Sequence, residues 1–381
     1  MVHPASIEKL KIAFLGGAIN SAVGSAHYSA IRLVNQFELV AGCFSLDKEF
    51  NQRTAEQYHV GLNRIYNNID ELIEKEKNNL NAIVVLTPTD QHAEHVIKFI
   101  RNNIPVICEK ALACTISEAE NIKRELEKNK GYLSVIYNYL GYPVFRELRY
   151  LILNGNLGKI HHIQIEMPQE GFDRVDTDGN PIVPQTWRLH DGIIPTISLD
   201  LGVHLHIMIK YLTGEKPLGV TALSKSFGNF QTVKDDISCI IEYSNDIVCN
   251  MWYSKIAIGN RNGLKLRIYG EQGSAEWLQE DPEHLKLADN RGKRWTLDRG
   301  SNDAKVCNQP RYSRFKAGHP AGFIEAFANY YTDIAGSLQS YNQNKTAYLN
   351  DDCFGITEAL EGLHLLDTIT RASSSKTWEE I

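Results

Sequence analysis

Paired cysteines, long apolar runs and a signal-like start are all missing from this chain of 381 residues. Its seven cysteines are scattered, odd in number and never arranged as CxxC, so we expect neither a disulfide framework nor a zinc knuckle, and no metal site. No stretch approaches the roughly 18 apolar residues of a membrane span. The first residues, MVHPASIEKL, lack the apolar core of a signal peptide. These absences predict a cytoplasmic protein that makes no membrane contact.

A basic surface is also missing, because the formal net charge is −6 and no long block of Lys and Arg occurs. Proteins that bind nucleic acid usually carry a basic stripe, so we do not expect that class of partner. Hydrophobic residues make up 43% and charged residues 23% of the chain, which is typical of a folded globular protein. The length suits two domains better than one.

The first third alternates short apolar runs with segments of helical spacing. Ser117, with Glu120 three residues later, is a capping signal for one of these helices. Strands alternating with helices indicate βαβ units and a parallel sheet, so residues 1–137 are predicted to form an α/β domain of the nucleotide-binding type. The expected strands occupy 11–15, 38–44, 82–86, 105–108 and 133–137, and the expected helices occupy 26–35, 92–102 and 117–129.

After residue 138 the pattern changes to strands in near succession. Adjacent strands without helices between them indicate a mostly antiparallel sheet. Residues 138–381 are therefore predicted to form an α+β domain built on one large open sheet. The expected strands occupy 160–167, 220–227, 237–243, 247–253, 264–270 and 274–278, and the expected helices occupy 143–153, 322–338 and 352–372.

A glycine-rich loop joins the first strand to the first helix. It contains Gly16, Gly17 and Gly24, with Ala18 at a position where such loops usually carry glycine. Glycines let the backbone turn sharply and approach a pyrophosphate, which then lies at the positive N-terminus of the helix. The spacing departs from G-x-G-x-x-G, so the place of the loop between strand and helix carries most of the prediction. These four residues are predicted to contact a dinucleotide.

The segment after the second strand is expected to contact the adenosine ribose. A dinucleotide site usually has an acid there, and in this chain the acid is displaced to Asp47, two residues after Ser45. Ser45 and Lys48 could instead accommodate a 2′-phosphate. The cofactor is therefore predicted to be NAD or NADP, with a slight preference for NAD.

Further motifs resemble those of a known family. They are Leu86-Thr87-Pro88 with His92, Glu109-Lys110, Trp187-Arg188, and Asp200-Leu-Gly-Val-His204. Together they are similar to the T-P-x-x-x-H, E-K-P, W-R and D-x-G-x-H elements of the Gfo/Idh/MocA oxidoreductases. The resemblance implies a Rossmann domain and a substrate domain whose large sheet often buries one face between subunits. It also implies NAD(P) and redox chemistry on sugars, sugar derivatives or cyclitols.

Two features depart from the family pattern. Ala111 stands where the family has proline after E-K, which puts in question the backbone that aims Lys110. The glycine loop is also longer than usual, which puts its pyrophosphate contacts in question.

Three residues are predicted to be catalytic. Removing the proton of a secondary alcohol during hydride transfer needs a base, and histidine is the usual one. Asp200 and His204 are four residues apart, so a helix would place both on one face, where the carboxylate could orient the imidazole and stabilise its charged form. Lys110 is expected at the carboxyl edge of the parallel sheet, where its ammonium could hydrogen-bond the substrate oxygen.

The other candidates divide into cofactor and substrate contacts. Pro88 and His92 are predicted to line the nicotinamide ribose, with a turn proline and a histidine at a helix start as the alternative. Thr87 is predicted to contact the cofactor, and Glu109 is expected either beside the cofactor or in a cap of its strand. Arg188 either grips a substrate oxygen or forms a surface ion pair. The candidate substrate contacts are Lys110, Tyr139, Trp187, Arg188, His204 and His319.

The predicted function is NAD(P)-dependent hydride transfer to or from a CH–OH group of a small polyhydroxylated substrate. The same residues would serve an NAD-dependent glycosidase that oxidises its sugar transiently. A non-enzymatic sugar or nucleotide sensor is a second alternative, although such proteins tend to lose the catalytic residues that this chain retains. Residues 247–253 carry apolar groups on both faces of their strand, so we expect a homodimer or homotetramer joined through the second-domain sheet.

Overall fold

The computed structural model describes residues 8–344 and 350–381 and divides into two compact units. The described residues up to Gly141, together with Phe323–Ala359, form the first unit. Tyr142–Gly322 and Leu360–Ile381 form the second. No helix within the described residues is long and apolar enough to cross a membrane.

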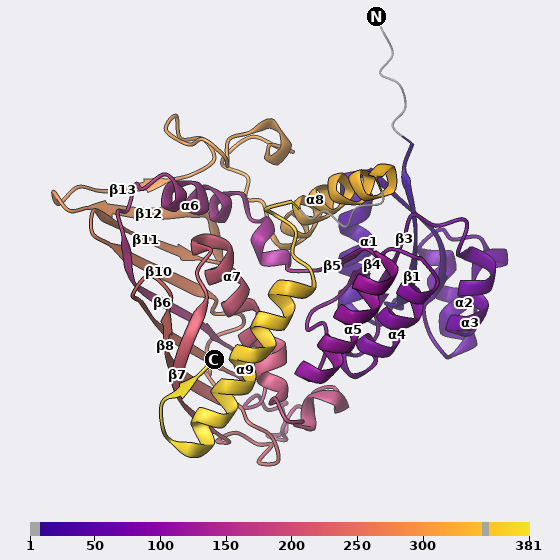
Figure 1. Cartoon of the computed structure of the whole chain (residues 1–381), viewed down its shortest axis with the longest axis horizontal. Coiled ribbons are helices and arrows are strands. Elements are labelled where there is room, and N and C mark those ends of the chain that lie inside the picture. The colour runs from indigo at the N-terminus through magenta and orange to yellow at the C-terminus, as the bar shows by residue number, and fades with distance from the viewer. Residues whose placement is uncertain (1–7, 345–349) are drawn as a thin grey trace, which may run out of the picture. The chain divides into compact units, whose positions relative to one another are not determined.

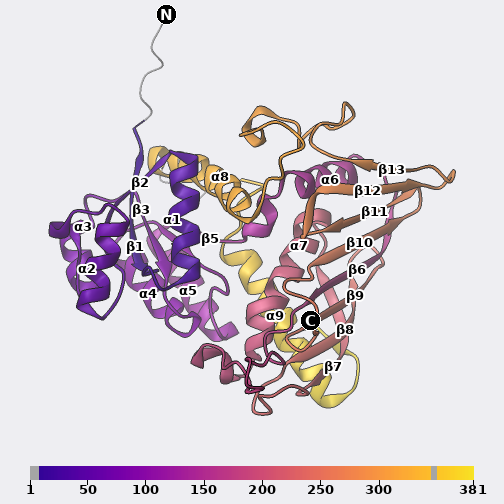
Figure 2. The same cartoon turned by 180° about the vertical axis from the view of Figure 1, so that it is seen from behind.

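The first unit is built on a parallel sheet with the strand order β2-β1-β3-β4-β5, which confirms the predicted Rossmann-type domain. In Figures 1 and 2, α4 and α5 lie on one face of this sheet, and α1 and α8 lie on the other. The strands are β1 (Leu10–Gly16), β2 (Phe37–Cys43), β3 (Ala82–Leu86), β4 (Val106–Cys108) and β5 (Leu133–Val135). The helices are α1 (Ala22–Val34), α2 (Lys48–Gln57), α3 (Ile69–Glu76), α4 (Thr89–Arg101), α5 (Ile116–Asn129) and α8 (Phe323–Asn344), with short turns at Leu62–Arg64 and Asn138–Gly141.

The start of α5 differs from its predicted capping signal. The structure caps this helix with Thr115, whose side chain accepts the amide of Glu118 while the Glu118 carboxylate accepts the amide of Thr115. The prediction named Ser117 and Glu120, which also have the capping-box spacing but lie inside the helix. Two overlapping S/T-x-x-E patterns two residues apart cannot be told apart by spacing alone.

Helix α8 belongs to the first unit, whereas the sequence prediction assigned its residues to the second domain. Its aromatic side chains pack on the first sheet and on α1. The Tyr331 ring lies 5.4 Å from that of Phe37, and the Phe327 ring lies 5.0 Å from that of His27. Burial of these large rings fixes the helix there.

The second unit is built on a nine-stranded sheet with the order β13-β12-β11-β10-β6-β9-β8-β7-β14. All of its neighbouring strands pair antiparallel except β6 and β9, which confirms the mostly antiparallel prediction. The strands are β6 (Ile160–Pro168), β7 (Pro217–Lys225), β8 (Asp236–Tyr243), β9 (Ile247–Ser254), β10 (Lys265–Gly270), β11 (Gly273–Leu278), β12 (Asp281–Asp289), β13 (Arg294–Leu297) and β14 (Glu379–Glu380). The helices are α6 (Pro143–Leu153), α7 (Val203–Thr213) and α9 (Ile356–Ser375), with a π-helical turn at Ser198–Gly202 and 3₁₀ turns at Thr186–Leu189 and Pro310–Tyr312.

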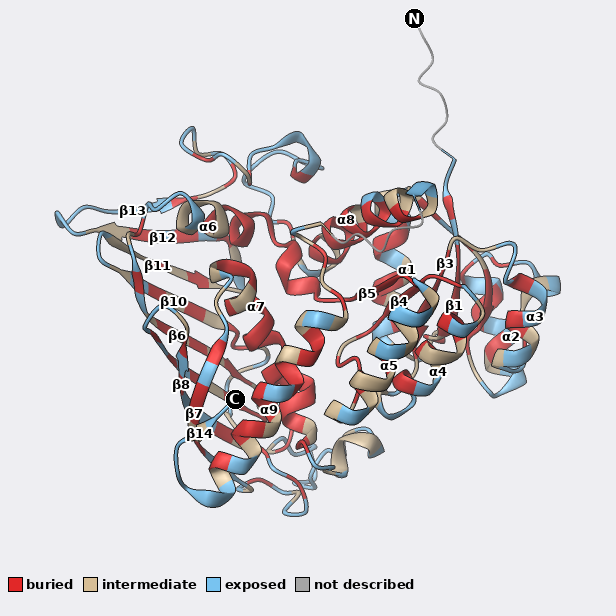
Figure 3. Cartoon of the chain, in the orientation of Figure 1, coloured by how far each residue is buried: buried red, intermediate tan, exposed pale blue. Residues whose placement is uncertain are grey.

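Helices α6, α7 and α9 lie against one face of this sheet (Figures 1 and 2). Along β9, Cys249 and Met251 on that side are buried, whereas Val248 and Asn250 on the other side are exposed. Figure 3 shows the same alternation of buried and exposed positions along neighbouring strands. The sheet therefore presents one covered face and one open face.

Candidate active site

The loop between β1 and α1 requires its glycines. Gly16 and Gly17 have φ angles of +81° and +73°, which side chains rarely adopt. A Cβ atom on Gly24 would lie 2.1 Å from the carbonyl oxygen of Gly17, so this glycine lets the helix pack against the loop. Ser21 caps the helix by accepting the amide of Gly24 at 3.2 Å. This geometry fits the N-terminal end of α1 as the place for a pyrophosphate, with buried Ala18 between the glycines.

Side chains from the α2 region support that loop. The Tyr58 hydroxyl donates to the carbonyl of Gly17 at 3.2 Å, and the Thr54 hydroxyl accepts the amide of Ile19 at 3.2 Å. Burial raises the pKa of Tyr58, so its hydroxyl keeps the proton that it donates. Hydrogen bonds from the α2 region therefore stabilise the glycine loop.

Asp47 serves as the N-cap of α2, a role that the sequence analysis did not consider. Its carboxylate accepts the amide of Phe50 at 2.9 Å, and the Ser45 hydroxyl accepts the amide of Asp47 at 3.1 Å. Both side chains thus hold the turn after β2 in shape. Contact with an adenosine ribose stays a prediction for both residues.

His92 is buried and contacts backbone carbonyls, and its predicted place beside the nicotinamide ribose stays a prediction. Its Nε2 lies 2.8 Å from the carbonyl oxygen of Thr87, and its Nδ1 lies 2.7 Å from that of Ala111. The residue is 1% exposed. The ring therefore links the turn after β3 to the turn after β4. Pro88, at the exposed N-cap position of α4, and Thr87 remain candidates for a cofactor contact.

Glu109 is tied into the interior of the first unit. Its Oε1 lies 2.8 Å from Nε2 of His27, and its Oε2 accepts the amide of Lys110 at 3.0 Å. The second nitrogen of His27 lies 2.6 Å from the hydroxyl of Tyr331. Glu109 thus holds the end of its strand, one of the two roles expected for it. The peptide bond between Lys110 and Ala111 is cis, at the position where the family pattern has proline.

Asp200 lies between two cations in the second unit. Its Oδ2 is 2.8 Å from Nζ of Lys255 and 3.3 Å from Nε of Arg188. Arg188 thus forms an ion pair, but with a buried carboxylate and not at the surface, and its contact with a substrate stays a prediction. Both the Asp200 and Lys255 side chains are 9% exposed, so water screens their attraction little. Two cations beside one carboxylate favour its ionised form.

Asp200 lies in the π-helical turn Ser198–Gly202, and His204 lies in the first turn of α7. Single π-helical turns are frequent at functional sites. The helix predicted through Asp200 and His204 is present, although its first turn is wider than the assumed α-helix. His204 is buried, with 5% of its surface exposed. The predicted orienting contact from Asp200 to His204 stays a prediction.

Lys255 is the functional candidate that the sequence analysis missed. It follows β9 directly, and its Nζ also donates to the side-chain oxygen of Gln169 at 2.7 Å. A lysine next to a buried apolar strand is a signal in the sequence, because a lysine is seldom buried unless it is paired. Gln169 comes close to Lys255 because β6 pairs with β9, and the local sequence pattern does not reveal this pairing.

The tip of Arg188 is held on three sides. Its guanidinium lies over the Trp187 ring, with 4.2 Å between Cζ and the ring centroid, and it also donates to Gln185. Trp187 in turn donates to Gln185 at 3.0 Å. Trp187 and Arg188, on the 3₁₀ turn Thr186–Leu189, are therefore partly exposed and pre-arranged.

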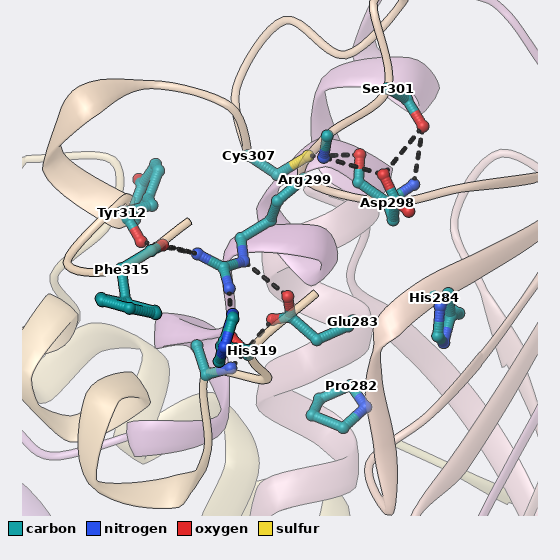
Figure 4. A network of polar contacts seen from close by, with 12 residues as sticks. Pro282, Glu283, His284, Asp298, Arg299, Ser301, Cys307, Tyr312, Phe315 and His319 are labelled. Carbon is teal, nitrogen blue, oxygen red and sulfur yellow. Dashed lines mark hydrogen bonds and ion pairs between the residues drawn. The ribbon is translucent and has the colours of Figure 1, made fainter. Parts of the chain in front are cut away.

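His319 lies on an irregular segment that is organised by Arg299 (Figure 4). Arg299 is 6% exposed and forms an ion pair with Glu283 at 2.6 Å. The same guanidinium donates to the carbonyl oxygens of Tyr312 and His319 at 3.1 and 2.9 Å. The His319 side chain is exposed, so this residue can meet a ligand while its backbone is held.

Tyr139 belongs to the first unit, on the turn Asn138–Gly141, and is 7% exposed. Its ring lies 6.1 Å from that of Phe323. Lys110 belongs to the same unit, whereas Trp187, Arg188, Asp200, His204 and His319 belong to the second.

Comparison with known proteins supports the resemblance stated above. Residues 10–137 match the model of an oxidoreductase family with an NAD-binding Rossmann fold, and residues 145–276 match the Gfo/Idh/MocA C-terminal domain. An uncharacterised oxidoreductase of Bacillus subtilis, YfiI, is 28% identical over 97% of this chain and 96% of its own. Glucose-6-phosphate 3-dehydrogenase of the same organism is 25% identical, over 73% of this chain and 77% of its own.

Solved structures agree with these sequence matches. An inositol dehydrogenase homologue from Azotobacter vinelandii, in complex with NADH and myo-inositol, superposes with a TM-score of 0.89 at 25% identity and covers 98% of both chains. A levoglucosan dehydrogenase with NADH and levoglucosan superposes with a TM-score of 0.82 at 18% identity, over 98% of this chain and all of the other, which supports the fold. The chain belongs to the Gfo/Idh/MocA family of oxidoreductases, and its first unit is the NAD-binding Rossmann domain of that family.

Proposed function

We propose that this protein transfers a hydride between a nicotinamide dinucleotide and a ring hydroxyl of a sugar, sugar derivative or cyclitol. The observation that carries the proposal is the Asp200 cluster. An almost fully buried carboxylate contacts Arg188 and Lys255 directly before the helix that bears His204. An ionised carboxylate favours the charged form of a nearby imidazole, as a base that accepts a hydroxyl proton requires, and the two cations offset part of this attraction. We infer this role for Asp200 toward His204.

The relatives support this choice of substrate and reaction. They include dehydrogenases named for glucose 6-phosphate, levoglucosan and inositol, all of which are polyhydroxylated rings. These names favour net oxidation over the transient oxidation of a glycosidase. They also favour an enzyme over a sensor on the same fold.

Each residue then has a separate task. The glycine loop and the turn after β3 would hold the dinucleotide, whose nicotinamide would supply or accept the hydride when bound. The Lys110 ammonium donates a hydrogen bond to the substrate oxygen and stabilises the negative charge that develops on it. His204 takes the hydroxyl proton at a ring nitrogen, and Asp200 remains ionised. Trp187, Arg188 and His319 offer the flat faces and donors typical of sugar recognition.

A substrate screen tests the proposal. Purified protein is mixed with NAD or NADP and with pyranoses, cyclitols and their acidic, phosphorylated and nucleotide-linked forms, and the absorbance of the reduced nicotinamide is followed. We expect reduction with at least one polyhydroxylated ring. Turnover of simple aliphatic alcohols alone would contradict the proposed substrate class. Failure of calorimetric titration to detect any dinucleotide would contradict the proposed reaction.

We further infer a cytoplasmic homodimer or homotetramer. None of the seven cysteines forms a disulfide bond in the described structure, which suits a reducing compartment. On the open face of the second-unit sheet, Leu223, Ile240 and Val248 are 56%, 47% and 40% exposed. Three large apolar side chains on neighbouring strands favour burial against a second copy.

Light scattering at micromolar concentration tests the assembly. We expect a mass that is an even multiple of the 43.1 kDa chain. Ile240→Glu should shift it toward the monomer, whereas Leu46→Glu, at an 89% exposed position of the first unit, should leave it unchanged. A monomeric wild-type protein would contradict the inference.

A further inference from the structure

Lys110 lies just beyond a very short strand, and two buried histidines contact groups next to it. Its strand, β4 (Val106–Cys108), has three residues. His27 comes from α1 and is 0% exposed, and His92 comes from α4 and is 1% exposed. Buried polar rings need partners, and here the partners are groups that border Lys110 in the chain.

On the N-terminal side, His27 holds Glu109. An ionised carboxylate only accepts hydrogen bonds, so Nε2 of His27 carries the proton that lies toward Glu109. Burial, and then the charge of Glu109, raise the pKa of Tyr331 well above its usual value, so the Tyr331 hydroxyl keeps its proton and can donate it to Nδ1. The His27 ring can thus contact Glu109 through Nε2 and Tyr331 through Nδ1 at the same time. The other oxygen of Glu109 accepts the amide of Lys110.

On the C-terminal side, His92 lies against the carbonyl of Ala111, the residue that follows Lys110. Its Nδ1 lies 2.7 Å from the carbonyl oxygen of Ala111, and its Nε2 lies 2.8 Å from that of Thr87. Burial lowers the pKa of His92, which favours the neutral ring. A neutral imidazole has one N–H, so the ring donates to one of the two carbonyls at a time.

We propose that His27 and His92 are positioning residues that fix the backbone on both sides of Lys110 and so aim its ammonium at the substrate oxygen. This inference rests on the role proposed for Lys110. A lysine side chain has many rotamers. The position of its Cα–Cβ bond therefore decides how often the ammonium lies at the substrate oxygen. A misplacement of about 1 Å lowers an enzymatic rate by roughly 100-fold.

Variants of His27 give the first test, with kcat and KM measured on the substrate found in the screen. His27→Leu removes both hydrogen bonds and should lower kcat by about 10- to 100-fold while KM and dinucleotide affinity change little. His27→Gln keeps a donor toward Glu109 and should recover most of that loss. Tyr331→Phe removes one hydrogen bond and should have a smaller effect. Tyr132→Phe is the matched control, because Tyr132 is equally buried in the same unit and its hydroxyl contacts Ser337 instead.

His92 gives a second and independent test. His92→Asn places an amide donor where Nδ1 was and keeps the contact to Ala111, whereas His92→Gln places it where Nε2 was and keeps the contact to Thr87. If the ring positions Lys110, the Asn variant should retain the higher kcat. Equal kcat values, or a higher value for the Gln variant, would overturn the role of His92.

A double-mutant cycle with Lys110→Met separates positioning from a general structural effect. If His27 acts through Lys110, then His27→Leu should cause no further loss of kcat in the Lys110→Met protein. The full multiplicative loss in that background would overturn the inference and leave the proposed function intact. A Lys110→Met protein with wild-type turnover would instead contradict the proposed function itself. If His27→Leu does not fold, the cycle is run with Tyr331→Phe, whose smaller loss of kcat should likewise disappear in the Lys110→Met protein.

Discussion

The two units hold their candidate residues in different ways. Around Lys110, the contacts are made to the backbone, since Glu109 accepts its amide and His92 lies against the next carbonyl. Around Asp200, the contacts are made to the charge itself, from Arg188 and Lys255. The first arrangement fixes the backbone from which the Lys110 side chain starts, and the second pairs the Asp200 carboxylate with two cations. Substitutions should therefore change geometry in the first unit and pH dependence in the second.

Apart from loss of the proposed base itself, the largest difference from wild type is expected when the ammonium of Lys110 is removed. Lys110→Met keeps the length of the side chain and removes its charge, so kcat should fall by about 100- to 1,000-fold, as in other deletions of a group that stabilises developing negative charge. Calorimetric titration should give unchanged dinucleotide binding, because the glycine loop is untouched. A loss of dinucleotide affinity with unchanged kcat would show that Lys110 belongs to the cofactor site instead.

Lys255 should have the next largest effect, and the effect should depend on pH. A hydrogen bond to a charged group is worth about 1.5–3 kcal/mol, so Lys255→Met should lower kcat by about 10- to 100-fold. One cation fewer makes protonation of Asp200 easier, so the acidic limb of the kcat profile should move to higher pH.

Two control variants separate the effect of the Lys255 charge from other effects. Lys255→Arg preserves the charge and should keep the acidic limb near its wild-type position. Lys234→Met, at an exposed lysine of the same unit, should leave the whole profile unchanged. A Lys255→Met profile that falls uniformly at every pH would mean that the lysine acts by packing.

Arg299 tests whether the second unit also contains a region held through its backbone. Arg299→Lys retains a charge for Glu283, but it cannot supply the guanidinium donors that reach the carbonyls of Tyr312 and His319. The segment that carries His319 should loosen, and KM should rise by several-fold, on the order of one neutral hydrogen bond, with a smaller change in kcat. Arg291→Lys, at an exposed arginine of the same unit, is the control. An unchanged KM would remove His319 from the substrate contacts.

The smallest effect concerns stability in the first unit. Burial lowers the pKa of His92 below its usual 6.5, so below about that pH the unfolded chain binds more protons than the folded one. The free energy of unfolding contributed by this group is present above the usual pKa and declines as the pH falls. Thermal unfolding should therefore show a stronger acid dependence for wild type than for His92→Asn. Parallel curves would mean that His92 titrates normally.

The parts of the fold that depend on local pattern were predictable from the sequence. Helix α6 was predicted at its observed bounds, and β3 was as well. Strands and amphipathic helices differ in the spacing of their apolar residues. In the glycine loop, each glycine stands where a side chain would be sterically unfavourable. Strands β12 and β13 were not predicted, because their charged, exposed positions hide the alternation.

The contacts that organise the candidate site were not predictable, because they join residues far apart in the chain. His27 and Tyr331 are 304 positions apart, and Lys255 and Asp200 are 55 apart. Asp47 illustrates the converse, since an acid after a strand suits a ribose contact and a helix cap equally well, and its observed hydrogen bond is to its own helix. The local sequence pattern can indicate a candidate residue, but it does not indicate which distant residue that candidate contacts.

The most direct test of the proposed chemistry is the rate of hydride transfer in Lys110→Met, His204→Asn and the double variant, with substrate and dinucleotide saturating. Loss of a positioned base should lower the rate of His204→Asn by about 100- to 10,000-fold. The double variant should lose less than the product of the two single losses, because residues that act together are not additive. A near wild-type rate in His204→Asn would contradict the assignment of the base, and Tyr139 and His319 would be the next residues to substitute.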